Sequence, residues 1–225
     1  MGVKIYLVLT LKALLYGAVL FGAAGTVLWP AGWVYLVLFV GGVIGLTIML
    51  ARHDPVLLAE RSKSPFQKGQ PLWDKIFLLL AIPALCGWIV LMPLDAVRFR
   101  WSAMPVWLQC AGGALMVLSF LMIGRVFLEN TFLTASVQIQ ADRGHHVIST
   151  GPYAVVRHPL YAALLIYLLA TPLLLGSWYG LAASVVLCGG LAFRTAMEDR
   201  ELHCGLQGYP EYAGRVRYRL IPPVW

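Results

Sequence analysis

The chain has 225 residues, of which 60% are hydrophobic and only 12% are charged, and its formal net charge is +7. A soluble domain could not cover this much apolar surface, so the composition excludes a soluble globular protein and indicates an all-α polytopic membrane protein. The positive charge could suggest nucleic acid. However, the basic residues cluster between apolar segments, which favours contact with membrane lipids and no nucleic-acid partner.

Six apolar runs have the length of about 17–25 residues that crosses a bilayer as a helix. We predict about six transmembrane segments, over residues 5–28, 33–50, 75–93, 105–128, 159–175 and 178–197. Only Gly176 and Ser177 separate the last two segments, which predicts a helical hairpin. The first apolar run leads directly into the second, so no removable signal peptide is expected.

The connections between these segments predict the orientation of the chain. Basic residues are frequent in residues 51–74, in residues 198–225 and in the connection that holds Arg143 and Arg157. All three connections fall on one side if all six segments cross. The positive-inside rule then predicts cytoplasmic N- and C-termini in a multi-pass protein, with the bacterial inner membrane as the expected location.

Residues 52–61 follow the second segment as a short amphipathic stretch. We expect this stretch to lie at the cytoplasmic interface with Leu57 and Leu58 in the lipid and its charges in water. The sequence assigns it no catalytic role.

Cysteine and histidine patterns do not predict a metal site. Cys86, Cys110, Cys188 and Cys204 are scattered without ligand spacing, and no disulfide framework is expected. The adjacent pair His145-His146 has no carboxylate or cysteine at a ligand spacing.

The most informative stretch is Gly151-Pro152-Tyr153-Ala154-Val155-Val156-Arg157-His158-Pro159-Leu160-Tyr161. Proline suits the first turn of a helix, so Pro159 places Arg157 and His158 at a helix entrance. Free backbone N–H groups there favour an anionic or polar ligand group. From these residues alone, an interfacial anchor with Tyr153 and Tyr161 in an aromatic belt is an equal alternative.

A second polar cluster follows the last segment, where the helix is expected to continue to residue 202. Arg194 and Glu198 are four residues apart, and Glu198 and Glu201 are three apart, so the three side chains share one helix face. A solvated helical extension with one weak ion pair would have the same pattern.

The pattern Gly-Pro-Tyr-x-x-x-Arg-His-Pro-x-Tyr resembles the signature of the isoprenylcysteine carboxyl methyltransferase (ICMT) family of integral-membrane enzymes, which is related to phospholipid N-methyltransferases. The pair Glu198-Asp199 falls at the family's Glu-Glu pair, and Tyr209 with Tyr212 resembles its Tyr-x-x-Tyr tail. Asp199 departs from the second Glu, and residues 206–208 depart from the usual Gly-Glu-Glu. The apolar runs predict N-terminal transmembrane helices over residues 1–128, and the resemblance, which covers about residues 136–225, predicts a catalytic core over residues 129–225 with a cytoplasmic-face cofactor site.

The resemblance implies S-adenosyl-L-methionine as the cofactor and methyl transfer to a lipophilic acceptor, with a carboxylate as the first expectation. Its implied catalytic residues are Glu198, as the base that an amine acceptor would need, and Arg194, as the group that grips an acceptor carboxylate. Arg157 would either orient the cofactor or brace the helix entrance. The implied cofactor-binding residues are His146, Val147, Ile148, Gly151, Tyr153, Arg157, His158, Pro159, Tyr161, Glu198, Asp199 and Tyr212.

Other functions fit the same sequence. They are a phospholipid-type N-methyltransferase, a sterol-reductase-like enzyme that uses NADPH, and a non-enzymatic membrane scaffold or carrier. A carrier would place ionisable groups near the middle of the membrane, whereas this chain keeps most of them near the segment ends. The acceptor's identity and the oligomeric state are left open by the sequence.

Overall fold

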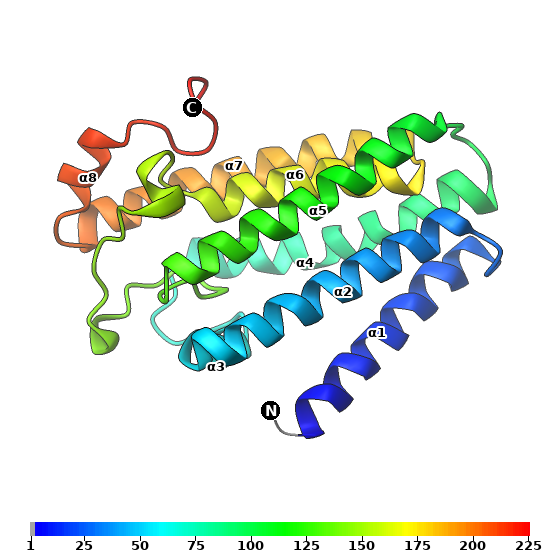
Figure 1. Ribbon diagram of the computed structural model, residues 1–225. Coiled ribbons are helices and arrows are strands. Elements are labelled where there is room, and N and C mark those ends of the chain that lie inside the picture. The colour runs from blue at the N-terminus through cyan, green and yellow to red at the C-terminus, as the bar shows by residue number, and fades with distance from the viewer. Residues whose placement is uncertain (1–2) are drawn as a thin grey trace.

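The computed structural model describes the backbone of residues 3–225 and the side chains of residues 9–225. Over that range the secondary structure is helical, without strands. The elements are α1 (Val3–Ala24), α2 (Pro30–His53), α3 (Pro55–Arg61), α4 (Leu72–Pro93), the π-helical turn η1 (Leu94–Arg98), α5 (Val106–Glu129), η2 (Ala141–Arg143), η3 (Gly151–Ala154), α6 (Pro159–Leu175), α7 (Trp178–Gly205) and α8 (Tyr209–Arg215). The long helices run side by side along the molecule (Figure 1).

Within the part of the chain that the structure describes, four helices are long and apolar enough to cross a membrane, namely α2, α4 with η1, α5 and α7. This confirms the expected all-helical membrane protein. Two further helices are apolar but shorter, which are the part of α1 over Leu9–Ala24 and α6. A crossing by α1 and α6 therefore stays a prediction.

Local residues explain where the helices depart from the predicted ranges. α1 ends at Ala24 rather than at residue 28 because Gly25 has a φ of 74°, which ends a helix readily. α2 begins at Pro30, since proline is favoured at the first helical position. The Asp54 side chain accepts a hydrogen bond of 2.8 Å from the Leu57 backbone N–H and so caps α3.

The α6–α7 hairpin forms as the sequence predicts. Gly176 has a φ of 81°, and its N–H donates to the carbonyl of Pro172 at 2.9 Å, which closes α6. Ser177 then accepts a hydrogen bond of 2.8 Å from the Gly180 N–H and caps α7. α7 continues to Gly205, so the predicted extension beyond residue 197 is confirmed.

α5 and α6 pack closely because α5 presents small residues to α6. A Cβ atom at Gly112 would lie 2.4 Å from the backbone nitrogen of Leu174 and 2.8 Å from the carbonyl oxygen of Ala170. The Ser119 hydroxyl donates to the carbonyl of Ala163 at 2.9 Å further along the same interface. This packing fixes α6, which carries the residues of the polar motif at its start.

We expect Gly112→Ala to destabilise the protein by about 1–3 kcal/mol, because the added methyl group meets the backbone of α6 rather than a movable side chain. Gly113→Ala is the matched control, since its added methyl group would lie 3.7 Å from Leu174 Cδ1, an ordinary contact. Thermal unfolding in detergent should show a lower midpoint for Gly112→Ala and no loss for Gly113→Ala. Equal midpoints for the two variants would contradict the close approach of α5 and α6.

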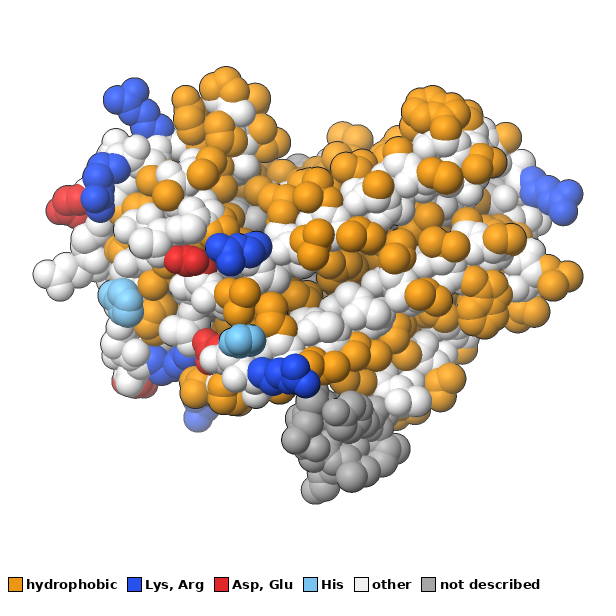
Figure 2. All heavy atoms as spheres, viewed as in Figure 1, with side chains coloured by type: hydrophobic (Ala, Val, Ile, Leu, Met, Phe, Trp, Pro, Cys, Tyr) orange, Lys and Arg blue, Asp and Glu red, His pale blue; other side chains and the backbone are white. Residues whose placement is uncertain are grey.

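Charged side chains gather at one end of the bundle. The face in Figure 2 shows most of the blue, red and pale blue atoms at the left, with orange hydrophobic atoms over the rest. The same end in Figure 1 carries α3, α8, the C-terminus and residues 130–150, which we call the linker. The linker joins α5 to the polar motif, so the fold brings the predicted site residues to the charged end.

The prediction for Leu57 was wrong. Its side chain is fully buried and packs in a cluster with Leu50, Ile123 and Phe127 rather than in lipid. α3 is therefore held against the bundle, and Arg61 at its end faces inward.

Candidate functional site

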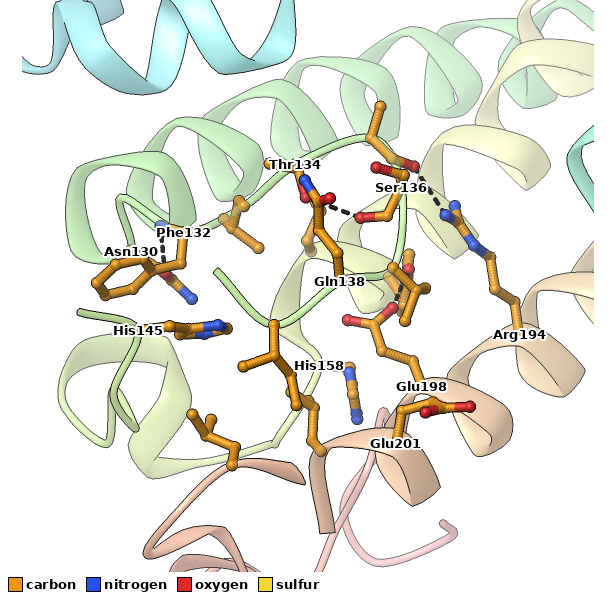
Figure 3. Close-up of a pocket in the computed structure, with 18 of the residues that line it drawn as sticks. Asn130, Phe132, Thr134, Ser136, Gln138, His145, His158, Arg194, Glu198 and Glu201 are labelled. Atoms are coloured by element: carbon orange, nitrogen blue, oxygen red, sulfur yellow. Dashed lines mark hydrogen bonds between the residues drawn. The ribbon is translucent and has the colours of Figure 1, made fainter. Parts of the chain in front are cut away.

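A pocket of about 670 Å³ opens at the charged end of the bundle. Its walls come from the linker, the first turns of α6, the C-terminal part of α7, and α8 with the residues before it. Figure 3 shows His145 from the linker and His158 and Glu198 from the opposite walls bordering one open space. The volume falls in the usual range for sites that bind small molecules.

Most of the residues predicted for the site line this pocket. They are His146, Val147, Ile148, Tyr153, Arg157, His158, Tyr161, Arg194, Glu198 and Tyr212. Gly151, Pro159 and Asp199 do not line it. The position of each of these three residues has a physical reason.

Gly151 and Pro159 act through the backbone. Gly151 has a φ of 56°, and a Cβ atom there would lie 2.6 Å from the carboxylate of Glu129. Pro159 is the first residue of α6 and fixes the start of that helix. Both residues border a second hollow beside α5 and shape the turn that carries the site residues.

Asp199 lies behind the pocket wall, with only 2% of its surface exposed. Its carboxylate accepts hydrogen bonds from Arg157 at 2.8 and 3.0 Å, from Arg219 Nε at 2.9 Å, from the Tyr209 hydroxyl at 2.8 Å and from His158 Nε2 at 3.2 Å. These donors occupy both oxygens. The placement therefore does not support the cofactor contact predicted for Asp199, and makes it a residue that positions its neighbours.

Arg157 braces the helix entrance, which is one of the two roles expected for it. Besides Asp199, its guanidinium donates to the carbonyls of Val216 at 2.9 Å and Arg217 at 3.0 Å. Its backbone N–H donates to the carbonyl of Tyr218 at 2.9 Å. Arg157 and Asp199 together clamp the C-terminal tail, residues 206–225, onto the motif.

Two carboxylates on one face of α7 line the pocket. The Tyr161 hydroxyl donates to Glu198 Oε2, and the Trp73 indole N–H donates to Glu201 Oε1 at 3.0 Å. The other oxygen of each carboxylate has no hydrogen-bond partner among the described residues. Glu201 was not predicted as a site residue, although its three-residue spacing from Glu198 was the signal for it.

Arg194 lines the pocket but already has an acidic partner. Its Nε donates to Asp74 Oδ1 at 3.0 Å, and its Nη2 donates to the carbonyl of Ala135 at 2.7 Å. Asp74 is fully buried and also accepts from Gln70 Nε2 at 2.6 Å and from the Val137 N–H at 2.9 Å. The pair therefore ties the linker to α4 and α7. A single aspartate at the start of an apolar segment gave no signal of this role.

The linker contributes aromatic rings that sequence analysis did not assign to the site. The rings of Phe132 and His145 are stacked with centroids 4.5 Å apart. Burial, with smaller contributions from the nearby charges of His146 and Arg143, lowers the pKa of His145 from 6.5 to about 4. His145 is thus neutral near pH 7 and presents an apolar ring face, which suits a flat heteroaromatic ligand.

Because the folded protein disfavours the charged form of His145, the unfolded chain binds more protons between pH 6.5 and about 4. The stabilising contribution of neutral His145 to the free energy of unfolding is therefore fully present above pH 6.5 and is lost as the pH falls toward 4. We expect the thermal midpoint of the wild type to decline over this window, and His145→Gln to show a smaller decline. His53→Gln, at an exposed position at the end of α2, is the control. An unchanged decline in His145→Gln would contradict this assignment.

Apolar side chains form the remaining wall. Leu78 and Ile82 come from α4, and Leu160 and Leu164 come from α6. α4 is also one of the helices that are long and apolar enough to cross a membrane, so the polar pocket adjoins a helix of that kind. The arrangement can take a ligand that is polar at one end and apolar at the other.

Comparison with known families agrees with the motif. The model of the isoprenylcysteine carboxyl methyltransferase (ICMT) family matches residues 106–204, which run from the start of α5 through α7. This range contains the linker, the polar motif, Arg194 and both pocket glutamates. No curated protein matches the chain significantly. The match confirms the resemblance over residues 106–204, which are similar to this family of membrane methyltransferases.

Proposed function

We infer that the protein transfers a methyl group from S-adenosyl-L-methionine to the carboxylate of a lipophilic acceptor at the cytoplasmic face of a membrane. The family supports methyl transfer, with carboxyl methylation as its named reaction. One observation carries the cofactor assignment, which is that the pocket combines the free oxygens of Glu198 and Glu201 with aromatic rings and an apolar wall. Of the two predicted catalytic residues, Glu198 has a carboxylate oxygen available in the pocket, whereas Arg194 lines the pocket but is held by Asp74.

The residues of the pocket fit the parts of the proposed cofactor. The Glu198 and Glu201 carboxylates suit its amino group and its sulfonium charge. The stacked pair Phe132 and His145, with Tyr153 nearby in the wall, suits its adenine ring. The volume of about 670 Å³ leaves space for an acceptor head group beside it.

When bound, the cofactor supplies an activated methyl group, so a carboxylate acceptor needs no strong base. The protein's part is then mainly orientation, which contributes up to about 7–11 kcal/mol in favourable cases. Tyr161 orients the Glu198 carboxylate through its hydroxyl, and Tyr212 closes the pocket by donating to the carbonyl of Tyr153 at 2.7 Å. The tail covers the pocket and excludes water from the acceptor oxygen.

The proposed topology has six crossings with both termini in the cytoplasm. α6 has 17 residues, which rise about 26 Å as a helix and approach the thickness of the hydrocarbon core. The basic residues of α3, the linker and the tail lie at the pocket end, which supports a cytoplasmic pocket by the positive-inside rule. In this proposal residues 1–128 anchor the protein in the membrane, and residues 129–225 form the catalytic core.

Calorimetry on the detergent-purified protein tests the proposal. We expect wild type to bind S-adenosylmethionine with micromolar affinity, and His158→Ala to bind at least about tenfold more weakly, because His158 is buried in the pocket wall and contacts Asp199. NADPH should not bind. Binding of NADPH in place of S-adenosylmethionine would favour the reductase function, and binding of neither by folded protein would favour the scaffold.

A further inference from the structure

Three guanidinium groups line the pocket, but only two of them have acidic partners. Arg157 is paired with Asp199, and Arg194 is paired with Asp74. Arg61 lines the same pocket and makes no ion pair with any carboxylate of the described residues. It is therefore the arginine whose charge the protein leaves unbalanced at this site.

The surroundings of Arg61 hold its guanidinium without neutralising it. Arg61 ends α3, whose buried Leu57 fixes that helix against the bundle. Its Nη1 donates to the carbonyl of Leu133 at 3.1 Å, and its guanidinium carbon lies 4.5 Å from the centroid of the Phe127 ring. These contacts leave its remaining N–H groups without a hydrogen-bond partner among the described residues.

An arginine in this setting favours an anionic ligand. Burial lowers the pKa of Arg61, which reflects the cost of removing its charge from water. A cation–π contact offsets only part of that cost. A carboxylate would offset it more fully, because it accepts two parallel hydrogen bonds from a guanidinium.

We propose that Arg61 is the carboxylate-binding residue of the pocket. The assignment rests on the proposed function, in which two ligands carry a carboxylate, namely the acceptor and the amino-acid part of the cofactor. Arg61 replaces Arg194 in this role, since the charge of Arg194 is already balanced by Asp74. It also gives α3 a function at the site, which the sequence did not assign to it.

The apolar neighbours of Arg61 suit the acceptor as the source of this carboxylate. Leu160 and Leu164 line the same pocket and pack in the cluster that holds Leu57 and Phe127. An amphiphile could place its chain along these leucines and its carboxylate at Arg61. The same position would also accept the cofactor's carboxylate, so the test treats the two sources separately.

The test compares matched ligands with and without a carboxylate, by calorimetry on wild type and on Arg61→Gln. For the cofactor, the pair is S-adenosylmethionine and decarboxylated S-adenosylmethionine, which keeps the amine and the sulfonium but lacks the carboxylate. For the acceptor, the pair is N-acetyl-S-farnesylcysteine and its neutral amide, in protein saturated with S-adenosylhomocysteine. We expect wild type to prefer the carboxylate in one pair, and Arg61→Gln to lose about 10- to 100-fold of affinity for that ligand alone.

Two further variants serve as controls for charge and for position. Arg61→Lys retains the charge and should keep part of the preference, while Arg52→Gln removes an exposed cation nearby and should change nothing. Thermal unfolding checks that Arg61→Gln is folded, because glutamine can still donate to the Leu133 carbonyl. If Arg61→Gln does not fold, Arg61→Lys carries the test, with the neutral ligands as the reference.

The outcomes separate the inference from the proposed function. Loss in the cofactor pair assigns Arg61 to the cofactor's carboxylate, and loss in the acceptor pair assigns it to the acceptor. The inference is overturned if wild type shows no preference for either carboxylate, or if Arg61→Gln keeps the wild-type preference. Absence of S-adenosylmethionine binding in wild type would instead refute the proposed function, and the acceptor pair, then measured without S-adenosylhomocysteine, would still test Arg61.

Discussion

Glu198→Gln is expected to weaken the binding of S-adenosylmethionine by about 10- to 100-fold, and Glu198→Gln with Glu201→Gln by more. Each glutamate has one oxygen without a hydrogen-bond partner among the described residues, so each can accept a charge-assisted hydrogen bond of about 1.5–3 kcal/mol. Glutamine keeps the shape of the side chain and an oxygen that accepts the hydrogen bond from Tyr161 or Trp73, but it removes the charge. Calorimetry with the purified variants measures the change.

A ligand without the amino-acid part separates a specific effect from a general one. 5′-Methylthioadenosine has neither the amino group nor the sulfonium charge, so its affinity should be almost the same in Glu198→Gln and wild type. Glu211→Gln, at an exposed site on α8, is the matched control and should bind both ligands as wild type does. Equal losses for both ligands would mean that Glu198 only maintains the pocket's shape.

The fold was largely predictable because apolar length and turn residues act locally. Apolar segments of sufficient length predicted the helices, and the short turn at Gly176 and Ser177 predicted the hairpin. Leu57 was assigned to lipid because its pattern on a short helix is the same whether the apolar face meets lipid or protein. The difference depends on Leu50 and Phe127, which contact Leu57 only in the folded bundle.

The site was predictable only where its residues are neighbours in sequence. The motif brought His158 and Tyr161 into the pocket, and helical spacing pointed to Glu201 beside Glu198. The partners of the charged residues could not be found in this way. Arg194 pairs with Asp74, which is 120 residues away in the chain, and no local pattern links the two.

The role of Asp199 was equally hard to predict from the sequence. The family's second glutamate suggested a ligand contact, but the carboxylate accepts hydrogen bonds from Arg157, His158 and Tyr209, and from Arg219 in the tail. A residue type and its position in a motif indicate that a carboxylate is needed there. Only the three-dimensional arrangement distinguishes a group that faces the ligand from one that holds the wall.

Asp199→Ala should therefore release the C-terminal tail and abolish cofactor binding. The substitution leaves Arg157 buried, at 7% exposure, without its counterion, and breaking a buried ion pair costs about 3–5 kcal/mol. Leu206, Tyr209 and Tyr212 would then no longer close the pocket. Hydrogen exchange across residues 206–225 and trypsin cleavage in that range measure the release.

The matched control for Asp199→Ala is Asp142→Ala, at an exposed position in the linker, which should leave tail exchange and binding unchanged. Asp199→Asn is expected to be intermediate, because the amide keeps hydrogen bonds but not the charge that four basic side chains surround. Glu198→Gln separates the two functions of this helix face, since it should lose cofactor affinity while tail exchange stays at the wild-type level. If Asp199→Ala kept a protected tail but lost binding, Asp199 would contact the ligand directly, and the division between Glu198 as a ligand contact and Asp199 as a clamp would be wrong.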